Sequence, residues 1–561
     1  MRGKMSHIEL LLILAIIVVV NVLGQYFYTQ IDLTEEKRFT LAEPTVDVLE
    51  DLNDVVTIQI LLEGEFPAGF RRLQAGVEET LRRFRSYTPY IEITYMDPNE
   101  GNVEKVNAMR QNLAERGIVP VNLRVNDGTE MKEKLIYPYA IFNYAGRSTV
   151  VNFLENNPGF NQEENLNNSV TQLEYKFIDA INKIQDPIRA NILFTTGRGE
   201  LSDEKTASFE AELRKYYLTD RLPIDSSISI SNEVDLVIVA KPTKPFSRRD
   251  KFVLDQYIMN GGKVLWLIDK LAVNLDSLNN TNTFVPPVVP TDLDDLFFNY
   301  GFRINADLVL DLECTRIPQV IGQQGGRPQI ELIPWYYHTL SAPRSNHPVS
   351  KNLDRVNLFF PSSIDTIKTK YPVKKSVLLS SSEYSRVQLT PTRVNFEILR
   401  YEPDPSKFDR PFQTMAVALE GIFPSQFENN LSAEMESTFE QLGIEFMPKS
   451  LPTKMIVISD GDIAKNLVDK NGKPQPLGYN KWENFVFTGN HDLLMNSVEY
   501  LLDDSGLLEA RSKEVKLRLL DRVRCQSERL QWQLFNIGIP LIFLGVFGFA
   551  FNYWRRKRYS I

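Results

Sequence analysis

The longest apolar run of the chain lies near its C-terminal end. No charged residue occurs between Leu530 and Trp554, and four basic residues follow directly. About twenty apolar residues at 1.5 Å per residue cover a hydrocarbon core of roughly 30 Å, and tryptophan prefers the membrane–water interface. The pattern predicts a transmembrane helix at residues 531–554 and a basic cytoplasmic tail at 555–561. The predicted membrane and partner contacts are Trp532, Trp554, Arg555, Arg556, Lys557 and Arg558.

A second apolar run begins at Leu10, after Arg2 and Lys4. A cleaved signal peptide would require small residues before the cut, and a lipoprotein signal would require a cysteine; the sequence NVLGQ offers neither. We therefore expect residues 1–28 to form a cytoplasmic N-terminus and an uncleaved transmembrane signal anchor. Basic residues at both ends of the chain predict two membrane passes, with both termini on the cytoplasmic side.

Strand and helix patterns alternate after the anchor. Residues 29–186 contain the order β-α-β-α-β-β, in which YPYAIFNYAG and RSTVVNFLE form a hairpin. This order predicts a thioredoxin-like α/β domain outside the cytoplasm. Since the chain has no C-x-x-C motif, thioredoxin-type redox chemistry is not expected.

A second α/β region follows at residues 187–505. Buried strands such as ANILFTT, VDLVIVA and KVLWLID alternate with helical segments, which predicts a parallel, flavodoxin-like sheet with any ligand at the carboxyl ends of its strands. Residues 315–410 predict strands without a definite order. Residues 506–530 predict an amphipathic stem helix, which either lies on the membrane or a partner or packs on the folded body.

Composition excludes some functions. The net charge is −9, and about −15 without Arg2, Lys4 and the four C-terminal cations, so the body would repel nucleic acid. The two cysteines, Cys314 and Cys525, suit neither a disulfide framework nor a zinc cluster. No nucleophile elbow, H-E-x-x-H motif or Walker A phosphate loop occurs, so neither a hydrolase nor an ATPase is indicated, although a Ser-His-Asp site stays possible.

Two loops are candidate binding sites. Glycines in residues 195–200 would let the backbone approach an anion that Arg198 pairs with, or the loop is a tight turn with Arg198 in a structural salt bridge. Asp460 and Asp462 follow a strand, where they would hold a hard cation or cap the next helix. The candidate ligand-binding residues are Gly197, Arg198, Gly199 and Glu200; Asp460 and Asp462 are only weak metal candidates, and no metal or cofactor is predicted.

Several segments together resemble a known family. They are DLTEEKRFTLAEPTVDVLEDL, VVTIQILLEGEFPAGFRRLQ, TTGRGE, MIVISDGDIAKN and FTGNHDLLMNSVEYLLDD, and the likeness extends from about Asp32 onward. The chain resembles the auxiliary ectodomain proteins of bacterial ABC transporters, and among them the gliding-motility-associated GldG group of the Bacteroidetes. That group more often has G-H-G-E where Arg198 stands here, so a role that rests on the histidine is in doubt.

The resemblance implies a non-catalytic subunit in the bacterial inner membrane, with a large periplasmic domain. Its partners would be a multi-span ABC permease, a separate cytoplasmic ABC ATPase and membrane lipid, but not nucleic acid. It also implies that the middle domain is similar to ThuA and amidotransferase-like domains without their nucleophile. Two other functions stay open: a sensor that binds a small molecule or glycan near Arg198, and a membrane-anchored amidotransferase-like hydrolase.

Overall fold

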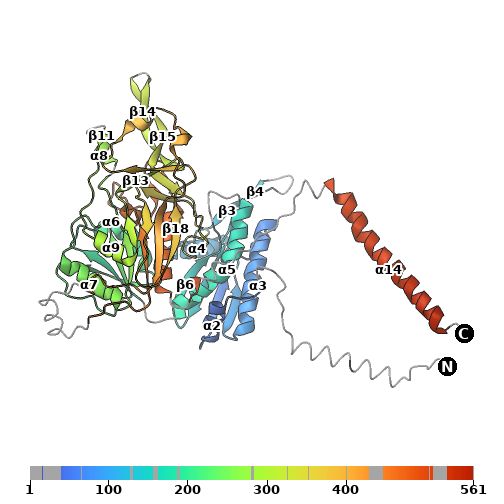
Figure 1. Ribbon diagram of the computed structural model, residues 1–561. Coiled ribbons are helices and arrows are strands. Elements are labelled where there is room, and N and C mark those ends of the chain that lie inside the picture. Colours follow the sequence, from blue (N-terminus) through green and yellow to red (C-terminus); the bar gives the residue numbers. More distant parts are fainter. Residues whose placement is uncertain are drawn as a thin grey trace. The chain divides into compact units, whose positions relative to one another are not determined.

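The fold comes from a computed structural model of the full chain. It describes residues 16, 40–64, 66–126, 131–155, 162–185, 190–273, 275–279, 283–324, 326–351, 353–399, 401–428, 446–503, 506–508 and 527–559. The described chain divides into two compact units, Met1–Lys513 and Glu514–Ile561, which we describe separately (Figure 1). The predicted N-terminal anchor, except Ile16, and residues 509–526 of the predicted stem lie outside the described residues.

The first unit begins with a four-stranded layer at residues 40–185. Its sheet has the order β2-β1-β5-β6, in which β1 is parallel to β2 and antiparallel to β5, and β5 and β6 form the predicted hairpin. The elements of this layer are α2 (Glu43–Glu50), β1 (Val56–Ile60), α3 (Ala68–Tyr87), β2 (Ile91–Tyr95), α4 (Val103–Glu115), β3 (Val121–Asn126), β4 (Met131–Ile136), β5 (Tyr139–Tyr144), β6 (Arg147–Asn152) and α5 (Gln162–Gln185).

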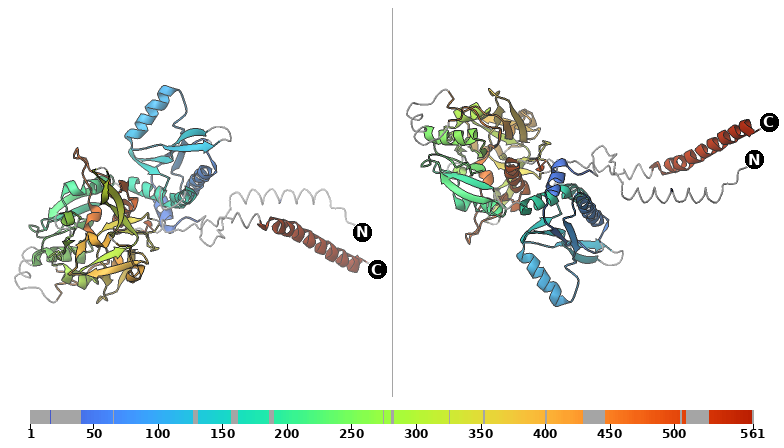
Figure 2. Two further views of the ribbon diagram at one scale, coloured as in Figure 1. Left: turned by 90° about the horizontal axis from the view of Figure 1, so that it is seen from above. Right: turned by 90° about the horizontal axis from the view of Figure 1, so that it is seen from below.

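Helices cover both faces of this sheet. Helices α3 and α5 place Leu73, Phe84 and Phe177 against one face, where the Phe177 ring contacts Phe84 and two further phenylalanines. Helix α4 contributes the buried Leu113 and the half-buried Met109 to the small cluster on the other face, and Figure 2 shows it at the margin of the layer. Strand β3 does not join this sheet, because it pairs with β4 in a separate hairpin.

A seven-stranded sheet forms the larger layer, at residues 190–503. Its order is β8-β7-β9-β10-β22-β21-β18; the first five strands are parallel, and β21 and β18 are antiparallel additions. The strands and main helices of the sheet are β7 (Asn191–Thr196), α6 (Asp203–Leu213), β8 (Leu218–Pro223), β9 (Leu236–Ala240), α7 (Arg248–Met259), β10 (Lys263–Leu267), β18 (Val373–Ser380), β21 (Thr414–Gly421), β22 (Thr453–Ile458) and α11 (Thr488–Leu502).

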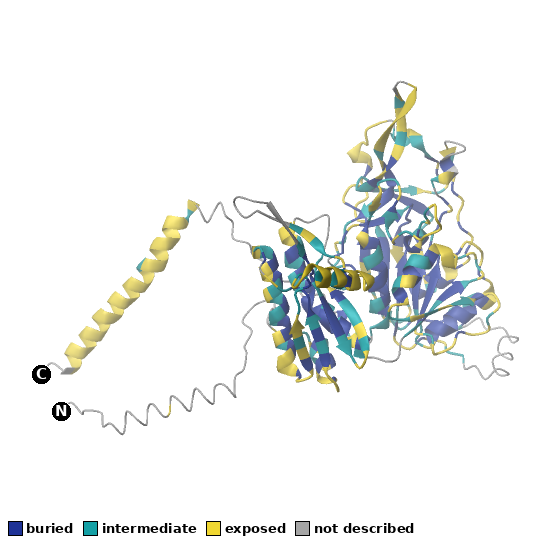
Figure 3. Cartoon of the chain, turned by 180° about the vertical axis from the view of Figure 1, so that it is seen from behind, coloured by how far each residue is buried: buried dark blue, intermediate teal, exposed yellow. Residues whose placement is uncertain are grey.

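Alternating residues of the parallel strands build two cores. On β10, Leu265 and Leu267 pack in the cluster that contains α6 and α11, while Val264 and Trp266 pack in the cluster that contains α7 and α9. Figure 3 shows the resulting continuous buried interior. A strand that is buried on both faces reads as an uninterrupted apolar run, which explains why VDLVIVA and KVLWLID identified this sheet from the sequence.

A long segment between β10 and β22 carries the remaining elements. They are α8 (Asp276–Asn279), β11 (Thr283–Phe284), α9 (Asp294–Tyr300), β12 (Phe302–Ile304), β13 (Asp307–Asp311), β14 (Cys314–Gln324), β15 (Arg327–Ser341), β16 (Val356–Phe359), β17 (Ile364–Thr366), β19 (Ser385–Leu389), β20 (Val394–Asn395), and the 3-10 turns η1 (Phe396–Leu399) and η2 (Pro405–Lys407). β14 and β15 form a long hairpin whose outer part is exposed (Figures 1 and 3). The short elements after β22 are η3 (Gly461–Ala464), β23 (Tyr479–Asn480) and β24 (Phe485–Val486).

The second unit is described through one long helix, α14 (Arg529–Tyr559). Its stretch Arg529–Arg558 has a mean hydropathy of 2.1, and among the described helices it alone is long and apolar enough to cross a membrane. The helix continues through the four basic residues, so the predicted tail is helical up to Tyr559. Length and composition support membrane association of this unit.

Candidate functional site

Four parallel strands end at one edge of the larger sheet. Strands β7 and β9 are followed directly by Gly197 and Lys241, and β10 and β22 are followed after one residue by Asp269 and Asp460. The chain passes from β7 to β8 on one side and then to β9 on the other, so the strand order reverses beside β7. Ligands of open α/β sheets bind at such reversal points.

The predicted loop at residues 197–200 lies at this reversal point. Gly197 and Gly199 adopt left-handed backbone conformations, with φ of 97° and 78°. A Cβ at Gly199 would overlap the Thr243 hydroxyl, because the backbone after β9 comes close to this loop. The Arg198 carbonyl accepts hydrogen bonds from the backbone N–H groups of Thr243 (3.0 Å) and Lys244 (2.8 Å). The glycines therefore allow two loops of the same chain to pack together.

The Arg198 side chain points to the start of α7. Its guanidinium lies 2.6 Å from the Asp250 carboxylate, whose side chain is 1% exposed and also closes the capping box with Ser247. Two buried polar atoms beside this loop have no hydrogen-bond partner among the described residues: Arg198 Nε and Asp250 Oδ1. Burial raises the pKa of Glu200, against the hydrogen bonds that it accepts. The geometry contains the structural salt bridge that the sequence left open as an alternative.

Asp460 and Asp462 lie in a buried ionic cluster. The Lys241 ammonium is 2.7 Å from Asp269 and 2.6 Å from Asp462, and Lys465 lies 3.5 Å from Asp462. Asp460 accepts hydrogen bonds from the backbone N–H of Asp462 (2.8 Å) and of Phe359 (2.6 Å). The helix expected after Asp462 is only the 3-10 turn η3, because residues 466–472, NLVDKNG, carry no apolar helical pattern.

The charges of this cluster depend on Lys241. Burial disfavours its ammonium, but Asp269 and Asp462 outweigh burial and raise the pKa of Lys241. Burial also opposes ionisation of Asp462, yet Lys241 and Lys465 lower its pKa. Burial and the neighbouring carboxylates raise the pKa of Asp460 well above its usual value. Burial raises the pKa of Asp269 as well, although Lys241 opposes this. The Lys241 ammonium thus compensates the charge of the buried carboxyl groups around it.

A cation at this edge would compete with Lys241. The described residues contain no group of three or more His, Cys, Asp or Glu side chains arranged to hold a metal ion. Lys241 and Asp269 were not selected from the sequence, although both directly follow buried apolar runs, VDLVIVA and KVLWLI. Lys241 also has a positive φ of 53°, a strained conformation for a residue with a side chain.

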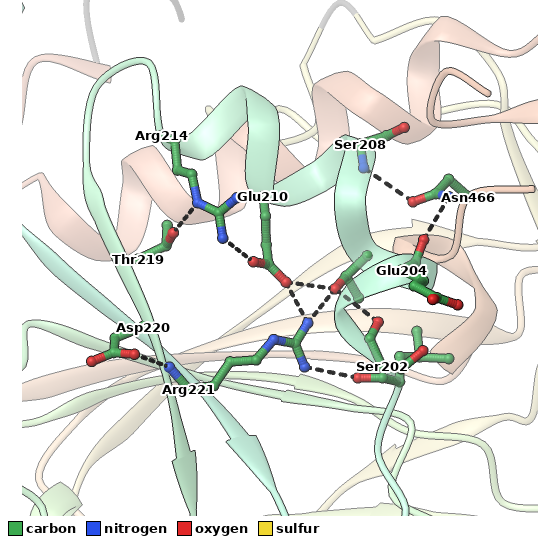
Figure 4. A network of polar contacts seen from close by, with 11 residues as sticks. Ser202, Glu204, Ser208, Glu210, Arg214, Thr219, Asp220, Arg221 and Asn466 are labelled. Carbon is green, nitrogen blue, oxygen red and sulfur yellow. Dashed lines mark hydrogen bonds and ion pairs between the residues drawn. The ribbon is translucent and has the colours of Figure 1, made fainter. Parts of the chain in front are cut away.

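A polar network joins α6 to β8 behind the 197–200 loop (Figure 4). The Arg221 guanidinium contacts the Glu210 carboxylate and the Thr206 hydroxyl, and it donates to the Leu201 carbonyl at 3.0 Å. Asn466 donates to the Glu204 carbonyl and accepts from the backbone N–H of Ser208. These contacts fix the helix that follows the loop, so the network supports the shape of this edge.

A polar cleft of about 810 Å³ lies on the other side of α6. Its wall includes Glu212, His491 and Asp492; the His491 imidazole lies 2.8 Å from Asp492 and 3.8 Å from Glu212. Burial disfavours imidazolium, but Asp492 and Glu212 raise the pKa of His491 to about 9. The neighbouring His491 imidazole is the main reason that the pKa of Glu212 falls to about 2. The sequence pattern gave no signal for this cleft, because its walls come from segments far apart in the chain.

The membrane-contact residues predicted at the C-terminus all lie on α14. Trp532 donates from Nε1 to Glu528 at 3.0 Å, and the Arg558 guanidinium lies 5.8 Å from the Trp554 ring. The helix places Trp532 near its first turn and Arg555, Arg556, Lys557 and Arg558 in its last turns. Aromatic side chains thus lie at both ends of an apolar segment of membrane-spanning length, and basic side chains lie at its C-terminal end.

Comparison with known proteins identifies the family of the larger layer. Residues 189–497 match the family described as "ABC-type uncharacterized transport system", the ABC transport auxiliary family, and this is more than half of the chain. The chain belongs to this family. A domain of unknown function, DUF7088, matches residues 35–143. Membership in the auxiliary family indicates a role in an ABC-type transport system, with permease and ATPase partners in general.

Two further proteins are similar to the chain. An uncharacterized protein of Borreliella burgdorferi is 22% identical over 502 residues, which cover 87% of this chain and 86% of that protein. The solved structure described as the mmIFT52 N-terminal domain has a TM-score of 0.30 and 14% identity, covering 56% of this chain and 97% of that one. The second likeness is too weak to support a statement about fold or function. The match to the Borreliella burgdorferi protein shows that this chain has a relative of similar length.

Proposed function

We propose that the chain is a non-catalytic periplasmic subunit of an ABC transporter complex that is associated with gliding motility. Its two terminal spans anchor it in the bacterial inner membrane, with both termini in the cytoplasm, and dock on a multi-span permease that is coupled to a separate ATPase. One observation carries this proposal: a chain of the transport auxiliary family ends in an apolar helix of membrane-spanning length. The motility association rests on the sequence resemblance to the GldG group.

Strand order supports the two domain types in this proposal. The order β2-β1-β5-β6, with β1 and β2 parallel and a helix after β6, is compatible with a thioredoxin-like domain. The order β8-β7-β9-β10-β22 matches the flavodoxin-like 2-1-3-4-5 pattern, which is also compatible with a ThuA-like domain. We assign them to residues 29–186 and 187–505, respectively.

The surroundings of Cys314 and His338, on β14 and β15, favour a structural role over catalysis. The Cys314 thiol is buried, which raises its pKa to about 12 and leaves it protonated and unreactive at neutral pH. Burial lowers the pKa of His338 to about 3, and its ring lies among Phe359, Phe360 and Trp482. Neither group is placed as an activated nucleophile or base, so the amidotransferase-like hydrolase is the weakest of the three functions.

Co-purification from native membranes tests the proposal. The tagged full-length protein, extracted in mild detergent, should recover a multi-span permease and an ABC ATPase in near-equal amounts. The matched control replaces α14 with an unrelated transmembrane helix of equal length, and it should lose both partners while staying in the membrane. Recovery of neither partner with the native protein would contradict the proposal.

A sensor function is the second candidate, and two unpartnered buried atoms beside the 197–200 loop favour it. A small polar ligand at the β7–β9 reversal point would satisfy Arg198 Nε and Asp250 Oδ1. Ligand screening by thermal shift, with Arg198→Ala as the comparison, separates the functions. A ligand that stabilises the native protein but not the variant would support the sensor, and Arg198→Lys should retain part of the shift.

A further inference from the structure

Strand β6 is the outermost strand of the four-stranded sheet, and one of its edges is open (Figure 1). The β5–β6 turn has two residues, Ala145 and Gly146, with φ of 47° and 79°, which is the type I′ geometry of a tight hairpin. The pair Tyr144–Arg147 that closes such a turn is hydrogen-bonded, and bonded and non-bonded pairs then alternate. Ser148 and Val150 consequently direct their backbone N–H and C=O groups away from β5.

These outward groups keep the spacing that another strand requires. Within the described part of the chain, no hydrogen bond reaches the outward N–H or C=O of Ser148 or Val150. The next outward carbonyl, that of Asn152, accepts from the Lys176 ammonium at 2.9 Å, which ends the open stretch. An extended peptide can add to an edge of this kind through its main chain.

A basic cleft of about 920 Å³ runs along β6. Its wall includes Arg147, Ser148 and Val150 from β6, and Arg116 from the end of α4. Lys183, Lys215 and His491 contribute to the other side, and no carboxylate belongs to the lining. The cleft is therefore cationic although the whole chain has a net charge of −9.

Acidic partners of these cations lie outside the lining. Lys183 is 2.8 Å from Asp179 and 2.6 Å from Glu499, and Lys215 is 2.5 Å from Glu212. Those ion pairs reduce the field of both lysines and hold them in place. Arg116 is exposed. It therefore supplies positive charge to the β6 side of the cleft, where an extended segment beside β6 can reach it.

We propose that the open edge of β6 and this cleft form a docking site for an extended, acidic peptide segment of a partner protein. The segment pairs through its main chain with Ser148 and Val150, and its carboxylates lie near Arg116 and Lys215. Charge complementarity selects an acidic segment, and the open backbone edge selects a peptide over a simple anion. A free phosphate would use the cations but not the outward N–H and C=O groups. The site is independent of the proposed transporter role.

Fluorescence anisotropy with the full-length protein in detergent micelles tests the site. The probe is a labelled hexapeptide of alternating Glu and Val, compared with the same peptide in which Lys replaces Glu. The acidic peptide should bind, and the basic one should not. A third probe carries N-methyl groups at alternate residues, which remove main-chain donors without changing charge, and it should bind at least about tenfold more weakly.

Two protein variants separate backbone pairing from charge. Ser148→Pro removes one outward N–H and is compatible with an edge strand, so affinity should fall about tenfold, whereas Ser148→Ala keeps that N–H and should bind normally. Arg116→Gln should weaken binding about threefold at low salt and very little at high salt, with exposed Arg82→Gln on α3 as the matched charge control.

Several outcomes would overturn the inference. They are equal binding of acidic and basic peptides, equal binding of the N-methylated probe, or no binding of the acidic peptide up to about 1 mM. Displacement of the peptide by inorganic pyrophosphate at equal concentration, with Ser148→Pro unaffected, would instead indicate a simple anion site. If Ser148→Pro fails to fold, the N-methylated probe on the native protein still decides the question.

Discussion

Replacing Lys241 by methionine should destabilise the larger layer more than any other single charge change at the sheet edge. The variant keeps the length of the side chain but leaves Asp269 and Asp462, whose side chains are only 13% and 15% exposed, without the ammonium that lies 2.7 and 2.6 Å away. Breaking a buried ion pair by removing one partner costs about 3–5 kcal/mol. Because the Lys241 side chain is 21% exposed, we expect the lower end, about 3 kcal/mol.

Urea unfolding of the full-length protein in detergent, followed by tryptophan fluorescence, measures this loss. Trp266 is fully buried on β10 and reports on this layer. With an m value of roughly 3 kcal/mol/M, the unfolding midpoint should fall by about 1 M urea. Lys465→Met is the matched control: Lys465 lies 3.5 Å from Asp462 and is 37% exposed, so its removal should cost less than about 1 kcal/mol.

The pH dependence gives a second readout with a defined sign. In the native protein the pKa of Asp462 is lowered, so its contribution to stability is present above the unfolded pKa and is lost as pH falls through the folded pKa. Without Lys241, burial raises the pKa of the same carboxylate, so the variant should lose stability as pH rises. The gap between native protein and variant should therefore be larger at pH 8 than at pH 5. A gap that is equal to that of Lys465→Met, or that widens at low pH, would refute this account.

Two further predictions concern the neighbouring loop and the polar cleft. Gly199→Ala should cost about 1–2 kcal/mol for its left-handed backbone, plus the overlap with the Thr243 hydroxyl. Adding Thr243→Ala should recover part of the lost melting temperature, and no recovery would show that the overlap is unimportant. His491 has a raised pKa, so its stabilising contribution should be complete below pH 6.5 and decline as pH rises through about 9. His491→Gln should abolish this decline in melting scans, whereas an unchanged alkaline decline would contradict the assignment; Glu212→Gln should reduce it.

The sequence identified the parts of the fold in which periodicity and burial coincide. The apolar strand runs, the β5–β6 hairpin and the C-terminal helix were all visible as patterns, because each is determined by its own residues. The pairing of β3 with β4 was not visible, since residues 127–136 carry no alternation strong enough to indicate a second strand. The sequence predicted no strand order for residues 315–410, because those strands pair with partners elsewhere along the chain.

The candidate sites divide in the same way. Gly197 and Arg198 were recognisable because a glycine turn after a buried strand has a local signature. Lys241 and Asp269 become a cluster with Asp462 only when three strands align, and nothing in their own neighbourhoods shows that they meet. The β6 edge has no compositional signature at all, because an open edge is defined by the strand that is missing beside it.

The larger sheet is completed by a segment that is made late. Strand β10 ends at Leu267, and its neighbour β22 begins at Thr453, about 185 residues further along the chain. At a synthesis rate of roughly 5–20 residues per second, about 10–40 s pass between the synthesis of β10 and that of β22. During that time the nascent chain exposes an edge in which Val264, Leu265, Trp266 and Leu267 are all buried in the finished protein. We therefore expect the nascent chain to need a chaperone that covers β10, for a time that increases with the length of the segment between β10 and β22.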